Sequence, residues 1–450
     1  MAWLQQWKRL WQERHNKLWV LPALNCVLAV LLALVAAWIP PFLPADLELP
    51  VINVDTLENL LTVIASSMLA VATFSLSIMV SAFASASNSV TPRATELVMG
   101  DEGTRTAIAT FLSAFIFSVV AQTALGLKYY GDNGRFILFI GTLLVLVGLM
   151  VTLLRWVRTL SSLGRLGNTL DRVEKAAEES LQQFWQSPLM GAQQGAIDLE
   201  PQPHWHAIRA DALLLVRRID MEQLHDLTQT HQCTLHLRVR PGAMVTPGDV
   251  LAWVEPSAAQ SHPTDADAES TMPEWLEDVA SAFHLDTSRT FDQDPRFSVI
   301  VLREAAQRAL STSVNDPGTA IACLHCLTRA LLHSQRNAAK VSANITNTAL
   351  QYPALTIPAL DTAELVVDGF DPIVRDGADS FEMMVRLQKM LALLHRESTD
   401  ERLRSALLDN AIYACERATT ELKNPRDQAH VQQVHDKYFA PLTQTRTVPY

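Results

Sequence analysis

Five hydroxyl side chains recur along one apolar segment of the sequence at helical spacing. They follow one another at steps of four, seven, four and four residues, and are Thr62, Ser66, Thr73, Ser77 and Ser81. On a helix this period places them along one face. Within a membrane, such a face either lines a water-filled path, where hydroxyl oxygens replace part of an ion's hydration shell, or packs closely against another helix. Packing is the usual outcome, and the spacing alone leaves both interpretations open.

A second polar group lies between two predicted helices in the latter half of the chain, where Asn315 and Asp316 precede Pro317. An aspartate can cap a helix whose first position is proline, so the simplest role of this junction is to end one helix and start the next. Alternatively, Asn315, Asp316 and the free N–H groups of the new helix bind a ligand or a partner subunit.

The remaining reactive side chains point to no chemistry. Cys323 and Cys326 have the spacing of half a zinc site, but no second pair exists and both lie in an apolar-periodic helix. We interpret them as buried free thiols. No phosphate loop, nucleophile elbow, zincin helix or Rossmann glycine set is present in the sequence. We therefore predict no catalytic residue, metal or cofactor. A membrane-bound enzyme stays a third alternative by default, and it would require a ligand at Asn315 and Asp316.

The hydroxyl residues belong to one of several segments long enough to cross a bilayer, which takes roughly 20 apolar residues as a helix. Residues 1–157 are predicted to form a membrane domain with four spans, which are 18–43, 57–83, 104–127 and 136–157. No charged residue or histidine lies near the middle of any span. Because proton-coupled transporters and pumps need an ionisable group there, anything that crosses is expected to cross passively.

Positive charges near the membrane predict the orientation, because Lys and Arg are retained on the cytoplasmic side. Four precede the first span and several follow the fourth, whereas residues 44–56 have none. Both termini are therefore expected to be cytoplasmic. Trp3, Trp7 and Trp11 predict an interfacial helix in contact with membrane lipids. The net charge of -11, most of which lies after Arg158, argues against nucleic acid as a partner.

The cytoplasmic part is predicted to be an α+β region. A helical extension and linker (158–202) leads to a small β-rich module (203–256), a flexible loop (257–271) and an α-helical bundle (272–450). In the module, strands alternate with Pro-Gly turns, as in the barrel-sandwich domains of biotinyl and lipoyl carriers. Those carriers need a lysine, and none occurs between Lys175 and Lys340. A swinging-arm role is thereby excluded.

Three blocks of sequence resemble a known family. They are TFSLSIMVSAFASASNSVTPRATELVMGDEGTRTAIATFLSAFIFS, RPGAMVTPGDVLAWVEP and RTFDQDPRFSVIVLREAAQRALSTSVNDPGTAIACLHCLTRAL. The family is that of domain of unknown function 2254, predicted bacterial inner-membrane proteins. Its pattern falls on Arg289, Asp294, Asn315, Asp316 and Thr319, which we take as candidates for contacting a ligand or a subunit. The chain departs from the family at Ser311-Thr312, where members have Ser-Pro, and at Leu214-Leu215, where they have Gly-Tyr.

The resemblance implies a multi-pass protein of the bacterial inner membrane but no activity. We hypothesise an oligomeric passive channel or permease-like protein, a homo-oligomer whose cytoplasmic domain assembles and gates a path for an ion or small ligand. The alternative is a membrane-anchored scaffold or sensor, whose spans only pack and whose cytoplasmic domain binds a partner or a small ligand.

Overall fold

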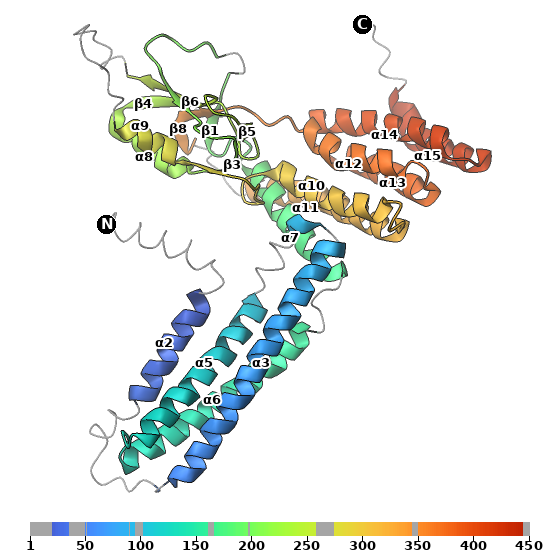
Figure 1. Cartoon of the computed structure of the whole chain (residues 1–450). Helices are drawn as coiled ribbons and strands as arrows, with labels where there is room; N and C mark the ends of the chain where they lie inside the picture. Colours follow the sequence, from blue (N-terminus) through green and yellow to red (C-terminus); the bar gives the residue numbers. More distant parts are fainter. Residues whose placement is uncertain are drawn as a thin grey trace. The chain divides into compact units, whose positions relative to one another are not determined.

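A computed structural model of the chain describes residues 20–35, 50, 52–89, 91–94, 102–160, 166–196, 199–257, 274–343 and 350–443. They fall into two compact units, Met1–Thr169 (unit 1) and Leu170–Tyr450 (unit 2) (Figure 1). The predicted tryptophan stripe and nearly all of the predicted flexible loop lie outside the described residues.

Unit 1 is helical. Its elements are α2 (Val20–Val35), α3 (Val54–Ser89), the 3₁₀ turn η2 (Pro92–Ala94), α5 (Glu102–Gly126) and α6 (Asp132–Leu160). Among the described residues, three helices are long and apolar enough to cross a membrane. The expectation of four spans is therefore confirmed for three. The first predicted span, 18–43, appears as the 16-residue apolar helix α2, and its residues 36–43 lie outside the described part of the chain.

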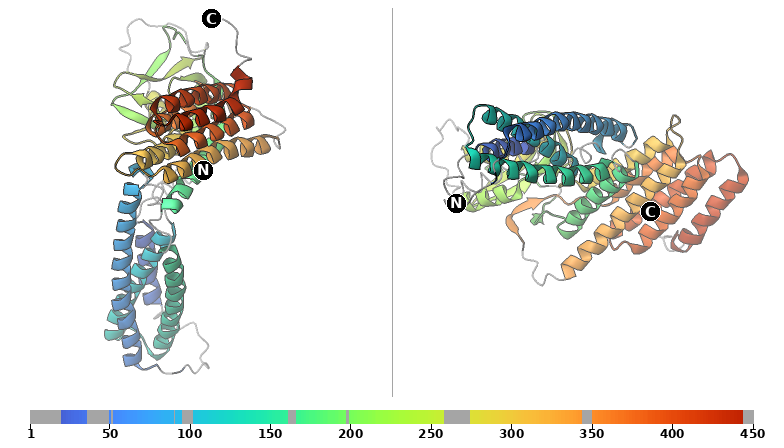
Figure 2. Two further views of the ribbon diagram at one scale, coloured as in Figure 1. Left: turned by 90° about the vertical axis from the view of Figure 1, so that its right-hand side faces the viewer. Right: turned by 90° about the horizontal axis from the view of Figure 1, so that it is seen from below.

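Helix α5 is the central helix of unit 1, since it packs against α2, α3 and α6 (Figure 2). Small side chains at Ala107, Ala114 and Ala121 face its neighbours and let the helices approach closely. A hydrogen bond of 2.7 Å from the Tyr130 hydroxyl to the Ala33 carbonyl joins the segment after α5 to α2. These contacts make one bundle of the four helices.

The described residues of unit 2 form two sheets. One has the order β1-β8-β4-β6-β2 and the other β5-β3-β7. The strands are β1 (Ala192–Gln194), β2 (His206–Arg209), β3 (Leu214–Ile219), β4 (Cys233–Leu237), β5 (Met244–Val245), β6 (Val250–Pro256), β7 (Phe283–Asp286) and β8 (Tyr352–Ile357). The predicted turns at Gly242 and Gly248 have φ angles of 90° and 95°, which glycine adopts without strain.

The barrel-sandwich expectation for residues 203–256 is not confirmed. Strands β1, β7 and β8 come from outside this range, and helix α8 (Met221–His231) lies within it. Strand β8 pairs with β4 in parallel, with Leu355 opposite Leu235. Two parallel strands need a long connection, so no local turn in the sequence indicates that β8 pairs with β4.

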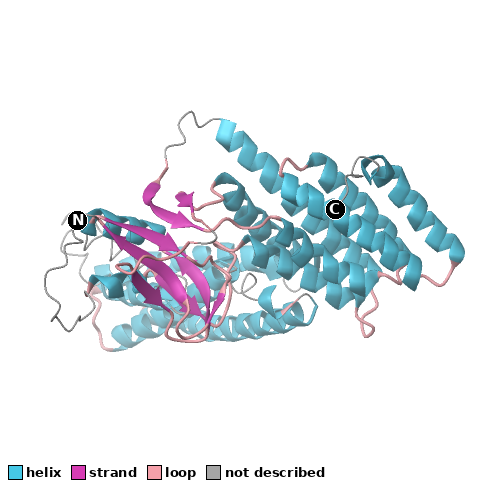
Figure 3. Cartoon of the chain, turned by 90° about the horizontal axis from the view of Figure 1, so that it is seen from above, coloured by secondary structure: helices cyan, strands magenta, loops and turns pink. Residues whose placement is uncertain are grey.

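The described helices of unit 2 other than α8 are α7 (Leu166–Gln186, which begins just before the division), α9 (Trp275–Ser281), α10 (Pro295–Leu310), α11 (Pro317–Ala343), α12 (Ala363–Gly377), α13 (Phe381–Glu397), α14 (Glu401–Glu421) and α15 (Pro425–Thr443). Helices α10 to α15 gather to one side of the strands (Figure 3), whereas α8 and α9 pack on the strands. Neighbours from α10 to α15 pack on one another, so the predicted helical region is a bundle. Its apolar positions form a buried core, with Phe370, Leu387 and Leu407 fully enclosed.

Candidate functional site

The five hydroxyl residues lie on the exposed side of α3. Thr62, Ser66, Thr73, Ser77 and Ser81 are all exposed in unit 1. The side of α3 that packs against α5 carries Leu61, Ile64 and Ala72, which are buried. At 3.6 residues per turn, this buried side points about 180° away from the centre of the hydroxyl stripe. Apart from one hydrogen bond at Thr62, described below, the stripe therefore takes no part in packing within unit 1.

Most of these hydroxyls are bonded to their own helix. Those of Thr62, Ser66, Thr73 and Ser77 donate to the carbonyl four residues earlier, at 2.7 to 3.1 Å. Their donors are thus satisfied, and each oxygen keeps lone pairs that can accept a hydrogen bond. Gln122 on α5 donates to the Thr62 oxygen at 3.0 Å, a partner that the sequence did not indicate.

Arg289 and Asp294 bind each other at the start of α10. The Nε and Nη2 atoms of Arg289 donate to the two carboxylate oxygens of Asp294 at 2.6 and 2.9 Å. Asp294, whose side chain is 2% exposed, also accepts from the backbone N–H of Phe297 and so caps α10. Such a bidentate pair uses most of the hydrogen-bonding capacity of both groups.

The Pro241-Gly242 turn packs directly on this ion pair. A Cβ atom at Gly242 would overlap Asp294 Oδ2 and lie 2.8 Å from Arg289 Nη2. The pair therefore holds the β-rich part of unit 2 against the start of α10, which is a structural role for two of the predicted contact residues.

The Asn-Asp-Pro junction joins α10 to α11 on the surface of unit 2. Asp316 accepts from the backbone N–H and the hydroxyl of Thr319, at 3.0 and 2.6 Å, and so caps α11. These hydrogen bonds lower the pKa of the Asp316 carboxyl. Asn315 has φ of 50°, a left-handed conformation that asparagine tolerates better than most residues. The helix-capping role predicted for Asp316 is thus confirmed.

The two groups of predicted contact residues do not form one site. Arg289 and Asp294 lie at the beginning of α10, whereas Asn315, Asp316 and Thr319 follow its end. A helix of 16 residues is about 24 Å long, so a small ligand cannot touch both groups.

The predicted free thiols are confirmed. Cys323 and Cys326 on α11 are free and buried, and burial raises the pKa of each to about 12. The Cys326 sulfur lies 3.4 Å from Arg329 Nη2. Within the described ranges, no group of three or more metal-ligating side chains occurs.

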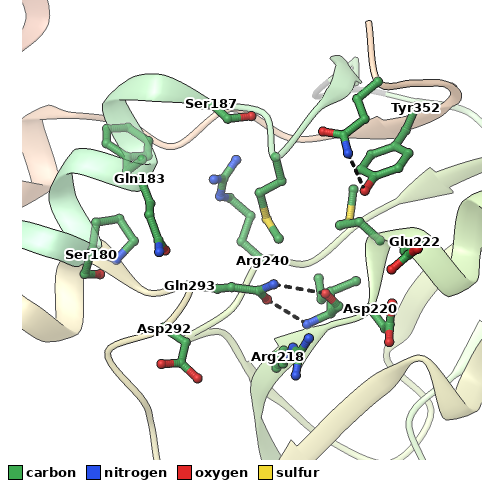
Figure 4. Close-up of a pocket in the computed structure, with 16 residues that line it drawn as sticks. Ser180, Gln183, Ser187, Arg218, Asp220, Glu222, Arg240, Asp292, Gln293 and Tyr352 are labelled. Carbon is green, nitrogen blue, oxygen red and sulfur yellow. Dashed lines mark hydrogen bonds between the residues drawn. The ribbon is translucent and has the colours of Figure 1, made fainter. Parts of the chain in front are cut away.

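The sequence did not reveal a cavity inside unit 2. It lies among the end of α7, the start of α8, the turn before α10 and the start of β8 (Figure 4). Arg240 contributes to its wall, and its guanidinium donates to the carbonyls of Pro358 and Pro188 at 2.8 and 2.9 Å. The walls come from segments far apart in the chain, which is why no local motif indicated the cavity.

These features describe a multi-helix membrane protein with a separate α/β unit. A family model, that of the predicted membrane proteins of DUF2254, matches residues 15–393. The chain belongs to this family. Comparisons with curated proteins and with solved structures give no match.

Proposed function

We propose that the chain forms a homo-oligomeric passive channel or permease-like protein in a bacterial inner membrane, with both termini in the cytoplasm. In this proposal the hydroxyl face of α3 borders the path, and unit 2 assembles the oligomer and gates the path. The observation that carries the proposal is the exposure of this face on the side of α3 opposite the subunit's own packing contacts.

The chemistry of the hydroxyl face supports conduction of an ion or a small polar solute. Because the hydroxyl donors are bonded within the helix, the free lone pairs present a row of oxygen acceptors. Oxygen acceptors can replace water around a permeating cation. The spans have no mid-membrane ionisable group, which fits passive movement rather than proton coupling.

Helix α7 supports a gating role for unit 2, because the chain enters unit 2 through it. Its Glu174 binds the Nε and Nη2 atoms of Arg329 on α11, with Nε at 2.5 Å. Its Glu178 accepts from Asn337 on α11 at 3.0 Å. A rearrangement of the helical bundle would therefore act directly on α7.

Ion flux tests the proposal. The full chain is reconstituted in liposomes or planar bilayers, and flux of several monovalent and divalent cations is measured for Ser77→Leu, Ser77→Thr and wild type. We expect Ser77→Leu to reduce flux by at least about tenfold, which is roughly 1.4 kcal/mol on the barrier. Ser77→Thr keeps the hydroxyl and should keep most of the flux.

Thr123→Leu is the matched control. Thr123 lies on α5, is exposed, and its hydroxyl donates to the Val119 carbonyl at 2.8 Å, as the α3 hydroxyls do to theirs. Its replacement should leave flux unchanged. Absence of flux for every cation, or equal losses from Ser77→Leu and Thr123→Leu, would contradict a path along α3.

A second candidate function, that of a membrane-anchored sensor, is supported by the cavity at Arg240. A sensor needs a binding site in unit 2 but no conduction through unit 1. It predicts a ligand-dependent change in unit 2 in protein that carries no flux, and reconstituted protein assayed for both properties separates the two functions.

A further inference from the structure

The cavity in unit 2 has the size of a small-molecule site. Its volume is about 350 Å³, within the range of ligand pockets in proteins. One wall is fixed by Gln293, whose amide nitrogen donates to the Ile219 carbonyl at 3.1 Å and whose amide oxygen accepts from the Ile219 N–H at 2.9 Å (Figure 4). The cavity is thus preformed rather than a gap between mobile side chains.

Arg240 makes one part of the cavity suitable for an anion. Its guanidinium is half-buried and donates to two main-chain carbonyls, but no carboxylate among the described residues lies within ion-pair distance. Asp294 acts on it electrostatically, yet both oxygens of Asp294 bind Arg289. Burial lowers the pKa of Arg240 to about 10. Charges removed from water are normally paired. The Arg240 guanidinium has no carboxylate in an ion pair with it among the described residues, so it is available to bind an anionic group of a ligand.

Ser180 supplies a second donor in the same cavity. Its side chain is only 5% exposed, and its hydroxyl has no hydrogen-bond partner among the described residues. Buried hydroxyls are almost always bonded, so an unpartnered one beside a cavity is a candidate binding group. The Ser180 oxygen has almost no accessible surface, so a rotation of its side chain is needed to bring the hydroxyl to a ligand. Ser180 and Gln183 line the cavity from α7, and Arg240 lies between them and the opposite wall (Figure 4).

The opposite wall is acidic. Asp220 and Glu222 lie at the start of α8, next to the phenol of Tyr352. Burial raises the pKa of Tyr352, and the charges of Glu222 and Asp220 raise it further. The lining residues carry three carboxylates and two guanidiniums in all, since Asp292 and Arg218 also contribute, and one of the carboxylates, that of Asp220, accepts from the Gln223 N–H and caps α8. A simple anion would be repelled by this excess of negative charge, and a simple cation would leave Arg240 without a counter-ion.

We propose that this cavity binds a small zwitterion, with its carboxylate at Arg240 and Ser180 and its amino group at the acidic wall that includes Glu222. Amino acids and short peptides are the class of molecule with this chemistry. The inference concerns unit 2 alone and holds whether or not unit 1 conducts.

Binding to the full chain in lipid nanodiscs tests the proposal, with thermal shift as a screen and calorimetry for affinity. The probes are the common α-amino acids and the dipeptide Gly-Phe. Each probe that binds is compared with its amide, which keeps only the positive charge, and its N-acetyl form, which keeps only the negative charge. We expect at least one zwitterion to bind at millimolar concentration or below, and both derivatives to bind at least about tenfold more weakly.

Two variants locate the ligand. Ser180→Ala removes a hydroxyl that has no hydrogen-bond partner among the described residues, so it should weaken binding several-fold and leave the melting temperature of the ligand-free protein unchanged. Glu222→Gln removes the charge of an exposed side chain while keeping its size, and it too should weaken binding several-fold. Arg240→Gln should abolish binding. It also removes hydrogen bonds to the carbonyls of Pro188 and Pro358, so a loss of binding in this variant can also come from a change in the fold.

Arg238→Gln is the matched control. Arg238 is two residues from Arg240, donates to the Ala196 carbonyl at 3.1 Å, and does not line the cavity. It should bind the ligand like wild type. The proposal is overturned if no zwitterion binds, if an N-acetyl form binds as tightly as its parent, or if Ser180→Ala and Glu222→Gln both bind like wild type.

Discussion

Gly242→Ala should destabilise unit 2 far more than a glycine-to-alanine change normally does. Two independent costs meet at this position. The backbone has φ of 90°, which costs an L-residue with a side chain about 1–2 kcal/mol. The new Cβ would also displace the buried carboxylate of Asp294 from Arg289. Disturbing a buried, hydrogen-bonded pair costs roughly another 1–3 kcal/mol, for an expected total of about 2–5 kcal/mol.

Gly248→Ala separates the two costs. Gly248 has a similar φ of 95° in the neighbouring Pro-Gly turn, but nothing lies within 4 Å of a Cβ built on it. Gly248→Ala should therefore lower the free energy of unfolding only by the conformational cost, about 1–2 kcal/mol.

Hydrogen–deuterium exchange on the full chain is the assay, because it reports the free energy of opening for chosen segments of a two-unit protein. Peptides that cover β4 to β6 and the start of α10 should lose protection in Gly242→Ala by about 1–3 kcal/mol more than in Gly248→Ala. Equal losses in the two variants would refute the packing of this turn on the Arg289–Asp294 pair.

Three further predictions concern polar groups of the helical bundle. Asp316→Ala removes the cap of α11 and should cost about 1 kcal/mol by hydrogen exchange of its first turn. In the wild type this stabilisation should be present above the ordinary aspartate pKa and be lost as the pH falls through the lowered pKa of the folded state. Burial lowers the pKa of His435, whose Nδ1 lies 3.1 Å from Gln388 Oε1, so stability measured by denaturant unfolding should decrease as the pH falls below about 6.5. His435→Gln should reduce that decrease. Arg329→Gln leaves the mostly buried Glu174 without its partner and should loosen α7 by about 1–3 kcal/mol in hydrogen exchange.

The controls for these variants lie nearby. Asp316→Asn keeps a capping oxygen and should retain most of the stability while losing its pH dependence at low pH. Arg336→Gln breaks an ion pair with Glu397 in which the arginine is 56% exposed, and should cost no more than about 1 kcal/mol. If Arg329→Gln and Arg336→Gln have the same effect, the contact between α7 and α11 does not hold α7 in place.

The elements that the sequence predicted correctly are those defined by local patterns. The second predicted span and its extension into the Ser/Ala/Asn-rich tail form one helix, α3, that ends at Ser89 before Pro92. The two Pro-Gly turns and the strands next to them also lie where the alternation of residues placed them. In each case a short stretch of chain determines its own conformation through periodicity, a breaker residue or a positive φ.

The elements that the sequence missed depend on distant contacts. Strand β8 joins its sheet from more than 100 residues beyond β4, and nothing near Tyr352 specifies that pairing. The sequence also did not indicate that Arg289 and Asp294, which we predict to contact a ligand or a subunit because the family pattern includes them, bind each other. A residue pattern that resembles a family's indicates that a position is important, but it does not show whether the side chain binds a ligand or stabilises the fold.

The same reasoning explains why the Arg240 cavity is a better place to look for a ligand than the motif residues. A side chain that holds the fold together has its polar groups bonded within the protein, as Asp294 has with Arg289 and with the start of α10. A side chain that awaits a ligand keeps a buried polar group unpaired, at a cost in stability that only binding relieves. Ser180 meets the second description, and the guanidinium of Arg240 lacks a carboxylate partner among the described residues. Whether a buried polar group has a hydrogen-bond partner therefore distinguishes residues that stabilise the fold of unit 2 from residues that can bind a ligand. Only the three-dimensional structure reveals this difference.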